Sequence, residues 1–175
     1  MRALLLSGCL MLSSAVAADA YHWLLPDSYQ SQPTDSVLSI NFKNPQQVLL
    51  NLTFHVDDEW RDVPAETMRD EFIDGLLAVP GVQSGRRFVL TLPEKTLGTR
   101  QIPAREFYCQ DWQGPGRGGK QIGRICVLAQ QALRVVVSLN SPSDHAKTAA
   151  EDYQLALSSL SLNWDALVLL RDSQP

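Results

Sequence analysis

A glycine-rich segment with a following lysine is the stretch of this sequence most suggestive of chemistry. Gly114, Gly116 and Gly119 match the pattern G-x-G-x-x-G, and Lys120 completes most of G-x-x-x-x-G-K-[ST]. In a phosphate-binding loop, backbone N–H groups after a strand hold a phosphate at the N-terminus of a helix. The first question is therefore whether these residues form a nucleotide site.

The residues on both sides of the glycines favour a β-hairpin over a nucleotide site. The preceding segment 105–110 is too polar for a central parallel strand, and segment 121–128 has the pattern of a strand where a helix is required. Gln121 also replaces the metal-binding Ser or Thr. A turn centred on Arg117 and Gly118 would instead set Cys109 opposite Cys126 and Trp112 opposite Gly123.

Basic side chains gather near the tip of this predicted hairpin. Arg117, Lys120 and Arg124 place positive charge on an otherwise acidic chain, and Trp112 lies in the same segment. The basic residues act either as solvated charge or as a docking loop for an acidic partner. We expect these four residues to contribute to partner binding.

A second candidate surface is the acidic segment FHVDDEWRD. Asp57, Asp58 and Glu59 follow a predicted strand, and Trp60 is either a lid on the core or an exposed interface anchor. The segment is a solvated strand-to-helix loop, a divalent-cation contact or a partner contact. It lacks the glycine of an EF-hand loop, so we expect no metal site. Partner binding is the functional role that we expect for these four residues.

Known catalytic motifs are missing from the sequence. His22, His55 and His145 are the three histidines, and each is expected to be structural or solvent-exposed. No G-x-S-x-G, H-E-x-x-H or C-x-x-C pattern is found. We therefore expect no enzymatic activity and no cofactor.

The N-terminus has the pattern of a cleavable secretion signal. The apolar run from Ala3 to Leu12 is too short to span a bilayer, and a small-x-small pattern predicts cleavage after Ala17, with Ala20 as a second possibility. A lipobox-like sequence ends at Cys9, but few apolar residues precede it, which disfavours lipid anchoring. We expect residues 18–175 to form a single periplasmic domain.

Charge and cysteine content narrow the class of protein further. The 175 residues carry a net charge of −4, which argues against non-specific nucleic-acid binding. No later apolar run is long enough for stable membrane insertion. Removal of the signal leaves only Cys109 and Cys126, and an even count in an exported chain suggests a disulfide. A metal pair or a catalytic thiol is the alternative, and no nearby histidine supports either.

Hydrophobic periodicity predicts strands in runs rather than strands that alternate singly with helices. The predicted strands are 22–25, 37–42, 48–56, 88–92, 101–112, 122–128 and 133–139. The second and third of these form a hairpin, and residues 31–36 are expected to be a loop.

Two segments have the period of a helix. Ala65, Met68, Phe72, Leu76 and Val79 form one apolar stripe, and Pro80-Gly81 is expected to end that helix. A second helix is expected from Ser141, with Pro142 at its first position and Asp144 completing a capping box; its stripe runs over 146–160. The tail after Asn163 is ambiguous. The fold class is α+β, with an antiparallel β-sheet meander covered by two main α-helices.

Both ends of the expected domain resemble PsbP/DcrB-type domains. The similar segments are YHWLLPDSYQ near the start and LRVVVSLNSPSDHAKTAAEDYQLALSSLSL near the end, and the helix after HVDDEWRD lies where theirs does. The resemblance implies an antiparallel sheet sandwiched by helices and a largely non-enzymatic role. Members serve as envelope proteins, photosystem assembly subunits, and adaptors or immunity proteins of type VI secretion.

These expectations combine into a functional hypothesis. The chain is expected to be a periplasmic protein-binding module, most specifically an immunity protein that neutralises a toxin or effector delivered to the periplasm. An envelope factor that binds a small ligand or lipid in a pocket between sheet and helices is the alternative. An envelope hydrolase is the third possibility.

Overall fold

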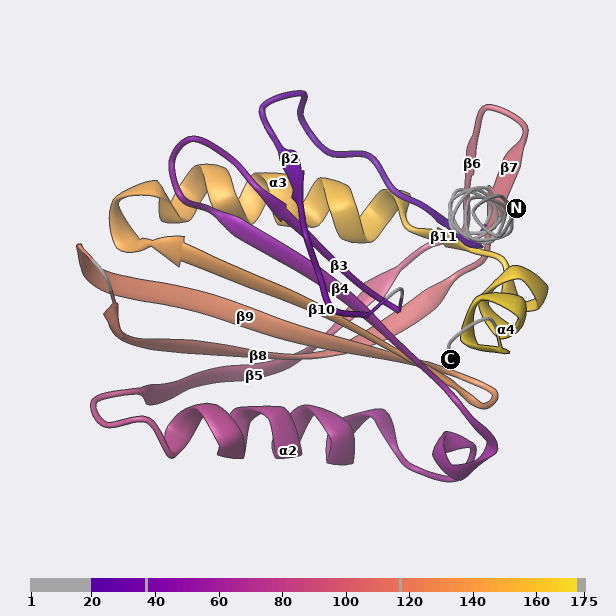
Figure 1. Ribbon diagram of the computed structural model, residues 1–175, viewed down its shortest axis with the longest axis horizontal. Coiled ribbons are helices and arrows are strands. Elements are labelled where there is room, and N and C mark those ends of the chain that lie inside the picture. The colour runs from indigo at the N-terminus through magenta and orange to yellow at the C-terminus, as the bar shows by residue number, and fades with distance from the viewer. Residues whose placement is uncertain (1–19, 37, 117, 173–175) are drawn as a thin grey trace, which may run out of the picture.

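A seven-stranded antiparallel sheet forms the centre of the protein, with strand order β2-β3-β4-β10-β9-β8-β5 (Figure 1). The computed structural model describes residues 20–36, 38–116 and 118–172, so the predicted cleavage site, Cys9 and Arg117 lie outside the described residues. The strands are β2 (Gln30–Gln32), β3 (Ser39–Lys43), β4 (Leu49–Val56), β5 (Gln83–Leu92), β8 (Arg105–Gly116), β9 (Gly119–Gln130) and β10 (Leu133–Pro142).

Helices cover both faces of this sheet, which confirms the α+β fold class. Helix α2 (Ala65–Leu77) packs on one face over β8 and β9, and α3 (Ala146–Ser159) packs on the other face against β10 (Figure 1). Two 3-10 helices, η1 (Asp58–Trp60) and η2 (Ser143–His145), precede them. Within the described residues, none of the helices is long and apolar enough to cross a membrane.

Shorter elements join the two ends of the described chain. Strand β1 (Tyr21–His22) pairs with β11 (Ser161–Leu162), and helix α4 (Trp164–Asp172) follows. The tail that the sequence left ambiguous is therefore helical from Trp164 to Asp172, and the first strand, Tyr21–His22, is shorter than the predicted 22–25.

The two faces of the sheet carry separate apolar layers because side chains alternate along each strand. On the α3 side the layer includes Phe54, Val137 and Tyr153. On the α2 side it includes Met68 and Trp112. The predicted alternation of segment 48–56 is confirmed, since the buried residues of that segment are Val48, Leu50, Leu52, Phe54 and Val56.

The glycine-rich segment forms the predicted hairpin between β8 and β9. Cys109 lies opposite Cys126, and Trp112 lies opposite Gly123, as the expected turn position requires. The hairpin between β3 and β4 is also confirmed.

The predicted start of the second helix is wrong. Ser141 and Pro142 extend β10, where they pair with Ile122 and Gln121 of β9. Helix α3 then begins at Ala146, and no side chain caps its N-terminus. The backbone of Ser141 and Pro142 is paired with the long β9 strand, so these residues stay extended and do not cap a helix.

Prolines divide the segment that was predicted as one strand over 101–112. Strands β6 (Lys95–Leu97) and β7 (Arg100–Ile102) form a small hairpin that continues the register of β5 and β8. Pro93 and Pro103 lie at the break, where they cannot donate to the ladder. The expected loop 31–36 also begins with β2, a short strand at the sheet edge.

Helix α2 is rotated relative to its predicted stripe. Ala65 and Met68 are buried as expected, but the next buried apolar residue is Ile73. Phe72 and Val79 are instead 39% and 49% exposed. The helix ends at Leu77, before the proline and glycine that were expected to end it.

Candidate functional site

The tip of the β8–β9 hairpin exposes Lys120. Gly118 and Gly119 have φ angles of 88° and 134°, which favour glycine and allow the tight turn. Lys120 is exposed and borders a shallow hollow beside the turn between α2 and β5. Among the hairpin residues that we expected to bind a partner, Lys120 is described and exposed, whereas Arg117 lies outside the described residues.

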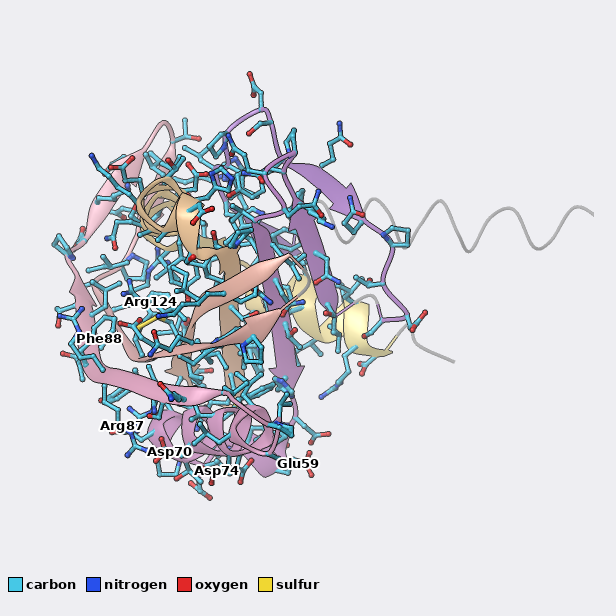
Figure 2. All side chains as sticks on the ribbon, turned by 90° about the vertical axis from the view of Figure 1, so that its left-hand side faces the viewer. Glu59, Asp70, Asp74, Arg87, Phe88 and Arg124 are labelled. Carbon is cyan, nitrogen blue, oxygen red and sulfur yellow. A yellow bond between two sulfur atoms is a disulfide. The ribbon has the colours of Figure 1, made fainter. Side chains whose placement is uncertain are left out.

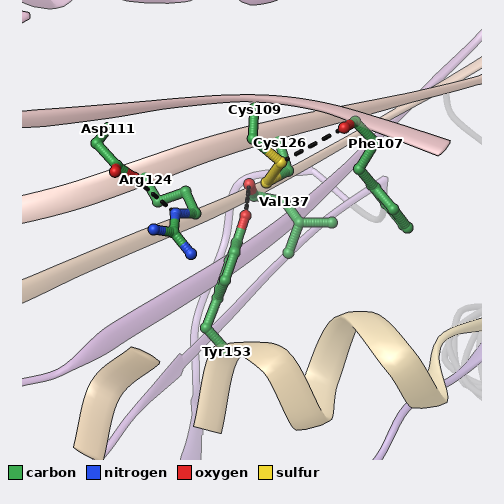
Figure 3. The surroundings of a disulfide bond; sticks show 7 residues. All are labelled: Phe107, Cys109, Asp111, Arg124, Cys126, Val137 and Tyr153. Carbon is green, nitrogen blue, oxygen red and sulfur yellow. Dashed lines mark hydrogen bonds and ion pairs between the residues drawn. A yellow bond between two sulfur atoms is a disulfide. The ribbon is translucent and has the colours of Figure 1, made fainter. Parts of the chain in front are cut away.

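Arg124 lies away from the tip, on the α3 side of the sheet. Its Nε donates to Oδ1 of Asp111 at 2.6 Å (Figure 3). Its guanidinium carbon also lies 4.7 Å from the centroid of the Phe88 ring, beside which it appears in Figure 2. Because a carboxylate neutralises this charge, Arg124 adds little to a basic tip.

Trp112 belongs to the core rather than to an exposed surface. It is 9% exposed and packs in the apolar layer beneath α2. Its indole lies across Gly123, where an added Cβ would come within 2.2 Å of the ring. This burial corrects the expectation that Trp112 is available to a partner.

An acidic surface surrounds the start and the outer side of α2. Asp57, Asp58 and Glu59 are exposed, and Figure 2 shows Glu59, Asp70 and Asp74 along this side of the molecule. We call these residues the acidic surface: Asp57, Asp58, Glu59, Asp62, Glu66, Asp70, Glu71 and Asp74.

Few cations offset this acidic surface. Among the described residues, its ion pairs are those of Asp58 with Arg61 and of Asp70 with Arg69 and Arg87. The pair between Asp58 and Arg61 is exposed and contributes little to stability. No group of three or more potential metal ligands converges anywhere in the described ranges. The surface therefore has the character of a charged contact area.

Three aromatic rings meet between the acidic surface and the sheet. The ring centroid of His55 lies 5.3 Å from that of Trp60 and 6.1 Å from that of Phe72. Trp60 is partly buried, so it both covers the core and presents an edge to solvent. His55 Nε2 is buried, with no hydrogen-bond partner among the described residues.

Burial lowers the pKa of His55 from its ordinary value of 6.5, and nearby Glu59 acts in the opposite direction. The folded state therefore favours the neutral ring. The contribution of neutral His55 to stability is complete above the unfolded-state pKa. It is lost as the pH falls through the lower, folded-state pKa. We expect His55→Phe to reduce the loss of stability between pH 7 and pH 5, as measured by urea unfolding.

The control for this prediction is His22→Gln, which changes a histidine in β1, outside this ring cluster. It removes a histidine while the rings of His55, Trp60 and Phe72 stay in place. An unchanged pH dependence in His55→Phe would show that His55 is not the group responsible.

An apolar groove lies along α2 and was not identified from the sequence. Its volume is about 310 Å³, and Phe72 and Leu76 form its wall on the helix. Leu49 of β4 and Val136 of β10 contribute to its floor. Part of the predicted stripe pointed to this groove, because the observed rotation of α2 places Phe72 and Leu76 of that stripe along its wall.

Arg105 has a structural role at the end of α3. Its guanidinium donates to the carbonyl oxygens of Leu157, at 2.8 Å, and Leu160. Burial lowers the pKa of Arg105 to about 10, still far above neutral pH. A cation at the C-terminus of a helix is favourable, so Arg105 fixes α3 to β8.

Comparisons of the sequence find no related family, whereas the structure has clear neighbours. No protein-family profile and no curated protein sequence matches the chain. The solution structure of cyanobacterial PsbP (CyanoP) from Synechocystis sp. PCC 6803 is similar with a TM-score of 0.58 at 11% identity, over 83% of this chain and 88% of that one.

Two further solved structures have the same architecture. LpqN of Mycobacterium tuberculosis, described as involved in cell envelope biogenesis, gives a TM-score of 0.52 at 13% identity, over 82% of this chain and 83% of LpqN. PA94 of Pseudomonas aeruginosa, described as a protein of unknown function and putative regulator, gives 0.51 at 15% identity, over 79% and 89%. The predicted resemblance is thus confirmed at the level of architecture, and the chain has the PsbP/DcrB-like fold.

Proposed function

We propose that this protein is a non-catalytic protein-binding module of the bacterial envelope and, more narrowly, an immunity protein that neutralises a toxin delivered to the periplasm. The observation that carries the proposal is the acidic surface beside the partly exposed ring of Trp60. Charge that is not paired within the chain can steer a basic partner, and tryptophan is a frequent anchor at interfaces.

The disulfide between Cys109 and Cys126 supports an oxidising compartment. Disulfides persist in secreted and periplasmic proteins and are rare in the cytosol. The signal-like N-terminus is consistent with the same location. Lys120 at the hairpin tip is a second proposed contact, toward acidic groups of the same partner.

We expect the double variant Asp57→Lys/Glu59→Lys to lose its partner while the fold remains intact. Both side chains are exposed, and neither forms an ion pair in the described part of the chain. Reversing two charges at such an interface should weaken binding at least tenfold at low salt. The measurement is recovery of a stoichiometric partner from periplasmic extract, followed by binding of the purified pair.

Glu151→Lys is the matched control, because Glu151 is exposed on α3, on the opposite side of the sheet. It should retain the partner, and Lys120→Glu tests the hairpin tip in the same assay. Equal recovery with wild type and the double variant would remove the acidic surface from the interface.

The immunity function has a separate test in cells. A strain that produces the partner in its periplasm should survive when wild-type protein is co-produced and should be inhibited with the double variant. A partner that is harmless when produced alone would contradict the immunity proposal while leaving partner binding intact.

A second candidate function is the binding of a small apolar ligand in the groove along α2. It is favoured by the groove's lining, in which Phe72, Leu76 and Val136 face a space of about 310 Å³. Native mass spectrometry of protein purified from the envelope would reveal a retained molecule. Protein that carries no added mass and binds no fluorescent fatty acid would contradict this candidate.

A further inference from the structure

The two edges of the central sheet differ in how they are protected. At one end β2 is only three residues long, and Pro33 follows it directly. At the other end β5 is ten residues long and, within the described residues, pairs only with β8 (Figure 1). Short edge strands and prolines prevent further pairing, whereas a long edge strand offers a row of free backbone groups.

One half of β5 has features that prevent pairing with a further strand, and the other half lacks them. A register shift between Ser84 and Arg87 interrupts the first half, which also carries the charged Arg86. From Phe88 to Leu92 the pairing with β8 is regular, and the sequence FVLTL contains no charge and no proline. This second half has the features of a strand that pairs with another strand.

Apart from the exposed Thr91, the side chains of the unprotected half are apolar, and they lie on both faces of the sheet. Phe88 and Leu90 lie on the α3 side, where they pack partly exposed at the margin of the core. Val89 lies on the α2 side and is 49% exposed. An added strand would bury apolar side chains on both faces while it satisfies the backbone.

We propose that the occupant of this edge is a second copy of the chain, paired antiparallel through β5 with a two-fold axis at Leu90. In this register Phe88 faces the partner's Leu92, and Arg86 faces the partner's Glu94. The two-fold axis repeats each contact, so two Arg86–Glu94 pairs flank an apolar centre. A surface that complements itself in this way fits a symmetric dimer.

The two charged groups are free to form this contact. In the described part of the chain Arg86 forms no ion pair, and its guanidinium carbon lies 4.5 Å from the centroid of the Phe88 ring. Glu94 is exposed and accepts one long hydrogen bond, from the amide of Gln101 at 3.4 Å. Pro93 ends the regular part of the strand, so the pairing is short and the dimer weak.

Exchanging the charges of Arg86 and Glu94 tests the proposed pairing in the chain without its predicted secretion signal. Sedimentation velocity at increasing concentration should show wild-type protein in a monomer–dimer equilibrium. Arg86→Glu and Glu94→Arg should each lower the association constant about tenfold, because each places two like-charged pairs opposite each other. The combined variant Arg86→Glu/Glu94→Arg should restore it. Arg100→Glu, exposed at the end of the β6–β7 hairpin, is the control and should dimerise normally.

A cysteine scan tests the register independently. Leu90→Cys should cross-link to its own copy under oxidising conditions, because the two residues are directly opposed at the axis. Val89→Cys and Thr91→Cys should not, since each is offset from its own copy. A wild-type protein that stays monomeric at high micromolar concentration overturns the proposal, as does a combined variant that fails to regain the dimer. Cross-linking at position 89 or 91 instead of 90 overturns the register.

Discussion

Replacing Cys109 with serine is expected to lower the free energy of unfolding by about 2–5 kcal/mol under oxidising conditions. The bond joins directly opposed residues of β8 and β9 that are 17 positions apart in sequence. In the chain-entropy model, a loop of this length stabilises the folded state by about 3 kcal/mol, because the bond restricts the unfolded chain.

The surroundings of the disulfide add to this effect. Cys109 and Cys126 are both fully buried. Figure 3 shows Tyr153 rising from α3 beside the bond, and its hydroxyl donates to the Val137 carbonyl at 2.6 Å. A serine at position 109 would place a hydroxyl in this apolar layer, which costs free energy unless it finds a partner.

Chemical denaturation with and without a reductant measures the effect. Wild-type protein should lose stability when it is reduced, whereas Cys109→Ser should respond little to the reductant. Equal stability of oxidised wild type and variant would mean that the bond contributes nothing to the folded state.

The β8–β9 hairpin could be predicted because its determinants are local. Glycines at the turn fix the register, and the register sets Cys109 opposite Cys126 without information from the rest of the chain. The alternation in β4 was equally clear, because one face of that strand is buried and the other is not.

The errors arose where distant contacts determine the structure. Ser141 and Pro142 have the composition of a helix start, but pairing with β9 keeps them extended. On α2, both Phe72 and Ile73 suit an apolar stripe, and the position of the helix over β8 and β9 selects Ile73. Neither choice is encoded within a window of a few residues.

The candidate site was predicted only in part for the same reason. The exposure of Asp57, Asp58 and Glu59 follows from their position in a strand-to-helix connection. The pairing of Arg124 with Asp111 and the burial of Trp112 depend on which strand face each occupies and on what covers it. Charge and aromatic content alone therefore could not show which of these hairpin side chains are exposed and unpaired.

The close contact between Trp112 and Gly123 leads to a second prediction with a large expected effect on stability. Trp112→Ala is expected to lower the free energy of unfolding by about 3–5 kcal/mol, because it leaves a cavity under α2. Gly123→Ala is expected to cost about 1–3 kcal/mol, since its new Cβ would lie 2.2 Å from the indole of Trp112 and would displace the ring.

The double variant separates this packing from a general intolerance of substitution. Once Trp112 is alanine, the space above Gly123 is open, and alanine is intrinsically better than glycine in a strand by roughly 0.5–1 kcal/mol. Gly123→Ala should therefore change from destabilising to neutral or stabilising in the Trp112→Ala background. Urea unfolding of all four proteins gives the coupling free energy directly. If the two costs simply add, the glycine is required for some reason other than the ring, and the close approach of Trp112 to the β9 backbone is not what selects it.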